Sequence, residues 1–152
     1  MAGPDFGIAL GLAYQAFVDH LRSFLAGKGF GDLGRSDGYV FRALAERPMT
    51  VGALAARLGV TKQAAAQIVE DMRRRGYLRR DPDPTDRRAA LLALTDRGTA
   101  ALDAARQFHR RFERRLVREH GDDAVRALRA VITAMAGLTD DVPHPHIRAM
   151  YL

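Results

Sequence analysis

The fold is decided by residues 61–98, which run TKQAAAQIVEDMRRRGYLRR (61–80), DPDPTDRR (81–88) and AALLALTDRG (89–98). Apolar residues recur at helical spacing in the first part, which predicts a helix over 61–75 that ends before Gly76. Proline and aspartate in the second part favour a tight turn, so 77–81 and 89–94 are predicted to pair as a hairpin. Such a helix fits a groove of duplex DNA and the hairpin reaches beside it, which indicates a DNA-holding segment.

A shorter helix is predicted just upstream, over 51–58, with Thr50 as its N-cap. Gly59 ends this helix, because glycine tolerates the left-handed conformation that helix ends require. Thr61 then caps the next helix after a turn of two or three residues. This is helix-turn-helix spacing, and in that motif the second helix enters the major groove.

The outer face of the helix 61–75 divides into two parts on a helical wheel. Its N-terminal part is small and mostly uncharged, which suits base edges, so the expected base-reading residues are Lys62, Gln63, Ala66 and Gln67. Its C-terminal arginines suit phosphates, and the expected phosphate ligands are Thr50, Thr61, Arg73, Arg74 and, in the hairpin, Arg88, with Arg75 beside them. The inner face is predicted to hold Thr61, Ala64, Ala65, Ile68 and Met72. Glu70 fits this interface only if it pairs with a neighbouring arginine or accepts a hydrogen bond from cytosine.

A simpler interpretation is a solvated amphipathic helix whose arginines complement the helix dipole. The hairpin favours the DNA-binding interpretation, because a solvated helix alone does not explain a basic loop tip directly after a helix-turn-helix. The charge distribution points the same way. The chain carries a net charge of +6, and residues 57–80 hold seven basic residues against two acidic ones, an excess of five. Most of the positive charge therefore lies where a polyanion would bind.

Long helices are predicted at both ends of the chain. One spans 5–26 with a broad apolar face, and Ser36 is the expected cap of a helix that ends at Glu46. Thr95 is expected to cap a helix to about Glu119, and a last helix follows over 121–138. The tail 141–152 contains two prolines and is predicted to be irregular, and its two histidines make only a weak metal site.

Composition excludes several classes of protein. With 47% hydrophobic residues in 152, the chain is globular, and it has no cysteine for disulfides or thiolate metal sites. It has no apolar run of roughly 20 residues and no basic N-terminal leader, so no membrane association and a cytoplasmic location are expected. No nucleophile–base pair, phosphate loop or carboxylate dyad stands out. We therefore expect neither an enzyme nor a cofactor.

The turn from Asp83 to Arg88, followed by LTDRG at 94–98, resembles the wing signature of the MarR family of bacterial regulators. LAARLGV at 54–60 and RGYL at 75–78 are similar to the rest of that winged-helix pattern. The resemblance implies a mainly α fold: a winged helix-turn-helix lobe over 35–94 with a two-stranded wing, and long dimerisation helices in 1–34 and 95–152. It also implies a homodimeric, ligand-responsive repressor that binds a pseudo-palindromic operator in double-stranded DNA.

The resemblance also implies roles for single residues. Arg87 would enter the minor groove, and Asp86 would orient the wing by pairing with a nearby arginine. The alternative for these two is a turn-stabilising ion pair without a role in binding. Small aromatic or phenolic acids are the implied effectors, and the candidate pocket residues are Tyr14, His20, Tyr39 and Arg42. Each of these four is also a plausible core residue.

Two alternatives stay open. Arginines recur every fourth residue from Arg106 to Arg118, which favours a solvated or ion-paired face over a binding surface. The lobe as a whole could be a winged-helix protein-interaction module that no longer binds specific DNA, and Glu70 and the modest net charge support that alternative.

Overall fold

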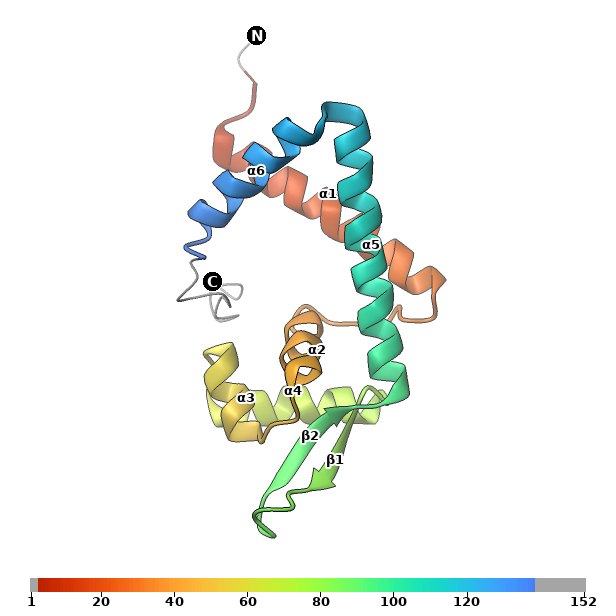
Figure 1. The fold of residues 1–152 in the computed structure, drawn as a ribbon, viewed down its shortest axis with the longest axis vertical. Coiled ribbons are helices and arrows are strands. Elements are labelled where there is room, and N and C mark those ends of the chain that lie inside the picture. Colours follow the sequence, from red (N-terminus) through yellow and green to blue (C-terminus); the bar gives the residue numbers. More distant parts are fainter. Residues whose placement is uncertain (1–2, 139–152) are drawn as a thin grey trace. The chain divides into compact units, whose positions relative to one another are not determined.

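The computed structural model describes residues 3–138 and is mainly helical with one small sheet (Figure 1). In chain order the elements are α1 (Phe6–Gly27), α2 (Asp37–Glu46), α3 (Val51–Leu58), α4 (Lys62–Arg74), β1 (Leu78–Pro82), β2 (Ala90–Leu94), α5 (Asp96–His120) and α6 (Asp122–Met135). The predicted element order and fold class are confirmed. The tail 141–152, with its two histidines, lies outside the described residues.

The helix-turn-helix forms through local capping. The Thr50 hydroxyl accepts a hydrogen bond from the amide of Ala53 at 3.2 Å, and the Thr61 hydroxyl accepts one from Ala64 at 3.1 Å. Gly59 between the two helices has φ +67°, the left-handed conformation expected of a residue that ends α3. These contacts satisfy amides that a helix start otherwise leaves without partners, so they fix where α3 and α4 begin.

The core side of α4 differs from the predicted wheel, and Thr61, predicted to face the core, is exposed at the helix start. Ala65 and Met72 are buried as expected, but Val69 is also fully buried, whereas Ile68 is only half-buried. Leu54 and Leu58 of α3 are buried as well, and α3 and α4 pack on each other. The inner stripe of α4 is therefore rotated slightly toward Val69.

The hairpin is antiparallel, with Leu78 opposite Leu94 and Pro82 opposite Ala90. The first strand begins one residue later than predicted, because Tyr77 is drawn into the core with no exposed surface. Met49 adds an isolated bridge to Leu92, with amide-to-carbonyl distances of 2.8 and 3.3 Å. That bridge ties the wing to the segment before α3.

The start of α2 corrects the predicted cap. Ser36 precedes the helix, but its side chain makes no capping hydrogen bond. Instead the carboxylate of Asp37 accepts the amide of Gly34 at 2.8 Å, and Asp37 is itself buried. The inner face of α2 carries the buried Val40, Phe41 and Leu44, while Tyr39 is half-buried.

By Cα packing the chain forms two compact units, Met1–Leu33 and Gly34–Leu152. The first contains α1, and the second contains all the other elements. In the second unit α5 packs against α2 and α6, and Leu102, Ala105 and Phe108 are buried. The assignment of the chain ends to dimerisation stays a prediction.

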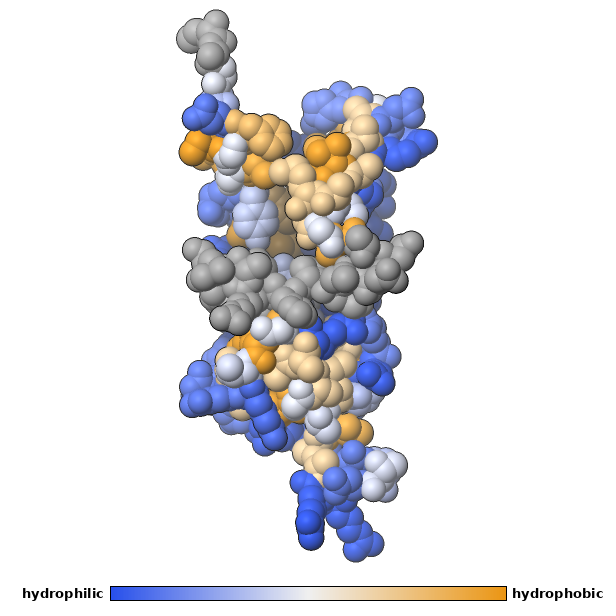
Figure 2. All heavy atoms as spheres, turned by 90° about the vertical axis from the view of Figure 1, so that its left-hand side faces the viewer, coloured by the Kyte–Doolittle hydropathy of each residue, from blue (hydrophilic) through white to orange (hydrophobic). Residues whose placement is uncertain are grey.

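Large apolar side chains are exposed to solvent on both units, as the hydropathy colouring illustrates (Figure 2). On α1 these include Phe6, 70% exposed, and Leu12, 63% exposed. On α6 they are Leu128, Val131, Ile132 and Met135, each about half exposed. Within residues 3–138, none of the helices is both long and apolar enough to cross a bilayer.

Candidate nucleic-acid interface

The N-terminal half of α4 presents a polar face to solvent. Lys62, Gln63 and Gln67 are exposed, and Ala66 lies half-buried among them. The helix is held from behind by its buried stripe, so these side chains share one face over its first two turns. The structure therefore brings together all four residues that the sequence predicts to face base edges.

The arginines that follow are already paired with acids of the same helix. Arg73 Nη1 lies 2.9 Å from Glu70 Oε2, and Arg74 Nη2 lies 3.7 Å from Asp71 Oδ1. The first of these pairs gives Glu70 the neighbouring arginine that it needs. Exposed ion pairs of this kind contribute about 0–1 kcal/mol, so a phosphate can replace the carboxylate at little cost.

Arg75 does not belong with the two arginines before it, which corrects the grouping of all three as phosphate-facing. Its side chain is 19% exposed and turns inward, where Nη1 lies 2.7 Å from Asp37 and Nη2 lies 2.6 Å from Asp71. Burial by itself lowers the pKa of Arg75, but the hydrogen bonds and charges of the two aspartates raise the pKa above its ordinary value. Arg75 is a structural cation.

The wing tip is ordered by its own side chains. Asp83 Oδ1 accepts hydrogen bonds from the amide and the hydroxyl of Thr85, at 2.9 and 2.8 Å. These bonds to the charged form lower the pKa of Asp83. Asp86 Oδ1 accepts the amide of Arg88 at 2.9 Å, and the carbonyl of Asp86 accepts the amide of Ala89 at 3.1 Å.

The hydrogen bond of Asp86 gives this side chain a role in the turn, and its predicted pairing with an arginine stays a prediction. An aspartate two residues before an amide closes a local turn, and here that turn needs only the backbone of Arg88. The side chains of Arg87 and Arg88 are both exposed at the tip. The wing thus carries two cations on a turn that its own hydrogen bonds already form without a bound partner.

The segment 94–98 is the junction between the wing, the end of α4 and the start of α5. The Thr95 hydroxyl donates to the carbonyl of Gly76 at 2.6 Å and accepts the amide of Gly98 at 3.1 Å. The Thr95 amide donates to the carbonyl of Tyr77 at 3.1 Å. Gly76 has φ +83°, so a glycine is favoured at that turn. The LTDRG sequence is therefore a docking element as well as a helix cap.

The candidate effector residues lie in different units. Tyr14 and His20 are exposed residues of α1, whereas Tyr39 and Arg42 lie on α2 of the second unit. Within the second unit, Arg42 is near two residues of α5 that the sequence did not place with it, Arg106 and His109. Their nearness depends on the packing of α2 on α5, which the periodicity of α5 alone does not reveal.

We call Arg42, Arg106 and His109 the α2–α5 basic cluster. Their positive charges repel one another. Burial and then the charge of Arg106 lower the pKa of Arg42, which Tyr39 partly offsets. Burial and then the charge of Arg42 lower the pKa of His109. The Arg42 guanidinium also donates to the carbonyl of Gly38 at 3.0 Å. Such a cluster favours an anion.

Ion pairs lie beside the basic stripe of α5. Arg115 lies 2.9 Å from Glu119 on the same helix, and Glu113 lies 2.6 Å from Arg129 of α6. The role of the stripe itself stays a prediction. Over the described part of the chain, no three His, Asp or Glu side chains are grouped as a metal site would require.

Comparison with known proteins bears on both the fold and the family. The model of the MarR family matches residues 32–89. No curated protein sequence matches the chain closely enough to count as a relative.

Similar solved structures cover most of the chain. The transcriptional repressor CouR, bound to a 23-mer DNA duplex, is 27% identical with a TM-score of 0.67, over 86% of this chain and 92% of that one. Streptococcus pneumoniae FabT in complex with DNA is 18% identical with a TM-score of 0.71, over 85% and 90%. E. coli MarR in its apo form is 20% identical with a TM-score of 0.62, over 88% and 98%.

The family model and these structures agree on different parts of the chain. The family model falls on the lobe that contains α2, α3, α4 and most of the wing, and the structural similarity extends through the helices on either side. Residues 32–89 thus match the MarR family of regulators, and the chain as a whole has the winged-helix fold of the solved MarR-family structures.

Proposed function

We propose that this protein is a homodimeric, sequence-specific DNA-binding repressor that responds to a small acidic ligand. The observation that carries the proposal is the wing turn, which holds the exposed Arg87 in the same unit as the exposed polar face of α4. A preorganised turn lowers the entropic cost of binding. CouR and FabT, which share the fold, were solved on DNA.

Each part of the interface has one task. Lys62, Gln63, Ala66 and Gln67 face base edges in the major groove, and Arg87 enters the flanking minor groove, where it responds to groove width. Phosphates are bound by Thr50, Thr61, Arg73, Arg74 and Arg88. The two threonine hydroxyls accept amides as helix caps and keep their own protons for donation to a phosphate oxygen.

The open apolar faces of α1 and α6 support the dimer. Side chains such as Leu12 of α1 and Ile132 of α6 are about half exposed or more, and several large apolar side chains exposed on one helix mark an interaction site. A second copy covers these faces and sets two lobes on one duplex. The operator is then a pseudo-palindrome whose half-sites lie one helical turn apart, about 34 Å.

The α2–α5 basic cluster supports the ligand response. Its two arginines and the phenol of Tyr39 suit the carboxylate and hydroxyl of a small aromatic or phenolic acid, and Tyr14 and His20 of the other unit stay candidate effector residues. Ligand binding shifts the population of dimers away from the spacing that fits the operator, which relieves repression.

The test is selection of bound sequences from a random duplex pool by the full-length protein. The proposal expects enrichment of two inverted half-sites one helical turn apart. Recovery of unenriched sequences contradicts specific recognition.

A protein-interaction module is the second candidate, because Glu70 and Asp71 neutralise arginines that a DNA reader would use. Loss of duplex binding at every salt concentration would favour this module.

A further inference from the structure

We propose that Arg75, Tyr77 and Arg97, anchored on Asp37, form a positioning clamp that sets the recognition helix and the wing relative to α5. The clamp tunes DNA affinity although none of its members contacts DNA. This inference rests on the proposed DNA-binding function. It assigns a role to four residues that the interface does not use.

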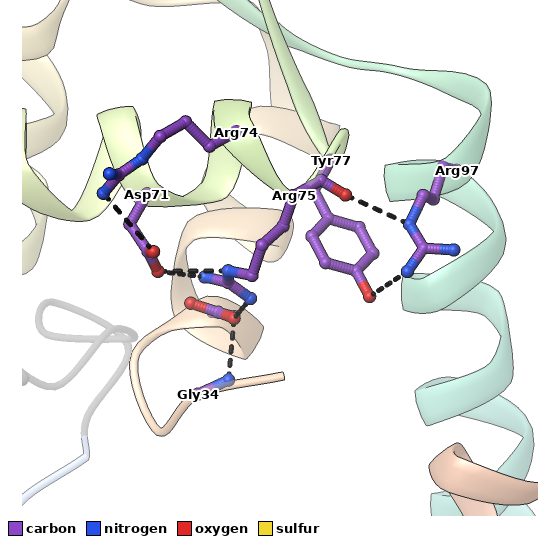
Figure 3. A network of polar contacts seen from close by, with 7 residues as sticks. Gly34, Asp71, Arg74, Arg75, Tyr77 and Arg97 are labelled. Atoms are coloured by element: carbon purple, nitrogen blue, oxygen red, sulfur yellow. Dashed lines mark hydrogen bonds and ion pairs between the residues drawn. The ribbon is translucent and has the colours of Figure 1, made fainter. Parts of the chain in front are cut away.

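The centre of the clamp is the ring of Tyr77, which lies between two guanidinium groups (Figure 3). The Arg97 guanidinium is 4.6 Å from the ring centroid and that of Arg75 is 5.5 Å from it. Arg97 Nη2 also donates to the Tyr77 hydroxyl at 3.0 Å, and Arg97 Nε donates to the Arg75 carbonyl at 3.2 Å. Arg97 therefore holds both the side chain and the backbone of the turn that ends α4.

The other end of the clamp is a buried ion pair. The carboxylate of Asp37 is 4% exposed and accepts from Arg75 at 2.7 Å and from the Gly34 amide at 2.8 Å. The rings of Phe41 on α2 and Tyr77 pack edge to face, with centroids 5.5 Å apart. Breaking a buried pair leaves an uncompensated charge, so this end resists displacement strongly.

Four elements meet at these contacts. Asp37 lies at the start of α2, Arg75 at the end of α4, Tyr77 before β1 and Arg97 in the first turn of α5. Each link has fixed geometry: a forked guanidinium, a planar ring or a backbone carbonyl. A displacement of α5 relative to the lobe must therefore either carry α4 and the wing with it or break these bonds.

Asp37, Tyr77 and most of Arg75 point into the protein, whereas Arg97 is exposed and is held by its contacts to the other members. Tyr77 has no exposed area, and Arg75 keeps only 19% of its side-chain surface. Arg97 uses its guanidinium on Tyr77 and on the Arg75 carbonyl. Positioning and contact residues differ in how their loss changes the salt dependence of binding, and that difference provides the test.

The experiment measures binding of full-length Arg97→Gln and Tyr77→Phe to the selected duplex at several salt concentrations. We expect affinity to fall by about 3- to 30-fold for Arg97→Gln, the range for residues that couple sites without touching the ligand, and by less for Tyr77→Phe. The slope of log K against log salt should stay at the wild-type value, because the number of neutralised phosphates is unchanged. A slope reduced by about one, as for a phosphate contact, would overturn the proposal.

Arg115→Gln is the matched control, since it removes the same charge from an exposed pair on α5. This variant should bind duplex with the affinity of the wild type. If its affinity falls as much as that of Arg97→Gln, the change in net charge explains the effect and the clamp does not.

A DNA-free measurement separates failure of the clamp from failure of the proposed function. In a double-mutant cycle on unfolding, Asp37→Asn and Arg97→Gln should be non-additive, because they act through the shared Arg75 and Tyr77. Additive effects overturn the clamp whether or not DNA binds. If the two effects on the free energy of unfolding are non-additive but the wild type does not bind duplex, the clamp couples these residues but has no role in DNA binding.

Discussion

The carbonyl oxygen of Tyr77 occupies the place where any residue larger than glycine at position 98 would put its Cβ. A Cβ built on Gly98 would lie 2.2 Å from that oxygen, closer than real contacts allow. Backbone meets backbone here, so no side-chain rotation relieves the clash. The first turn of α5 can approach the end of the recognition helix only because position 98 is glycine.

We therefore expect Gly98→Ala to lower the free energy of unfolding by about 3 kcal/mol, at the upper end of the usual cost of overpacking. Gly52→Ala is the control, because its nearest neighbour lies 3.9 Å away inside helix α3. That change should stabilise the protein by about 0.4–1 kcal/mol. Urea denaturation measures both, and equal effects at the two glycines would contradict the close approach.

Replacement of Asp86 distinguishes a turn-forming role from an ion pair. Asparagine keeps the side-chain oxygen that accepts the amide of Arg88, so Asp86→Asn should bind duplex within about twofold of wild type. Asp86→Ala loses the acceptor and should bind about tenfold more weakly, a loss of about 1.4 kcal/mol. Anisotropy titrations compare them. Equal losses in both variants would restore the ion-pair interpretation.

The apolar face of α6 should hold the dimer together. We expect Ile132→Glu to give a monomer, because a dimer would bury the new carboxylate. Light scattering at micromolar concentration measures the mass. Arg126→Glu on the same helix leaves this apolar face intact and should keep the dimer. A wild-type monomer would contradict the assignment of this face.

The lowered pKa of His109 predicts how the free energy of unfolding changes at acidic pH. Its pKa is lowered from 6.5 by burial and by Arg42, so the folded protein binds this proton less readily than the unfolded chain does. Stability should therefore fall as pH drops from neutral through 6.5, the unfolded value, and then through the lowered folded pKa. The melting temperature of His109→Gln should fall less over the same interval. An unchanged pH dependence in that variant would exclude this residue as the source.

What the sequence predicted well was local. The caps at Thr50, Thr61 and Thr95 and the turn at Gly59 act within a few residues, so each could be recognised from its neighbours. The hairpin followed from two apolar runs and the turn chemistry between them.

What the sequence missed depends on partners far along the chain. Arg75 looks like Arg73 and Arg74 until folding brings Asp37, 38 residues earlier, beside it. Likewise, Ser36 has the right type for a cap, but Asp37 takes the Gly34 amide. The α2–α5 basic cluster arises only from helix packing, and periodicity within α5 carries no signal of it. The individual DNA and ligand contacts stay predictions.

The central claim, that α4 and the wing bind duplex DNA, is tested most directly by the salt dependence of binding for wild type and Arg87→Ala. We predict that the wild-type affinity for the selected duplex falls steeply as salt rises. Arg87→Ala should bind more weakly, with a slope smaller by about one, because a single cation leaves the DNA. Binding that is absent or insensitive to salt, or an Arg87→Ala variant that matches the wild type in affinity and slope, would contradict the claim.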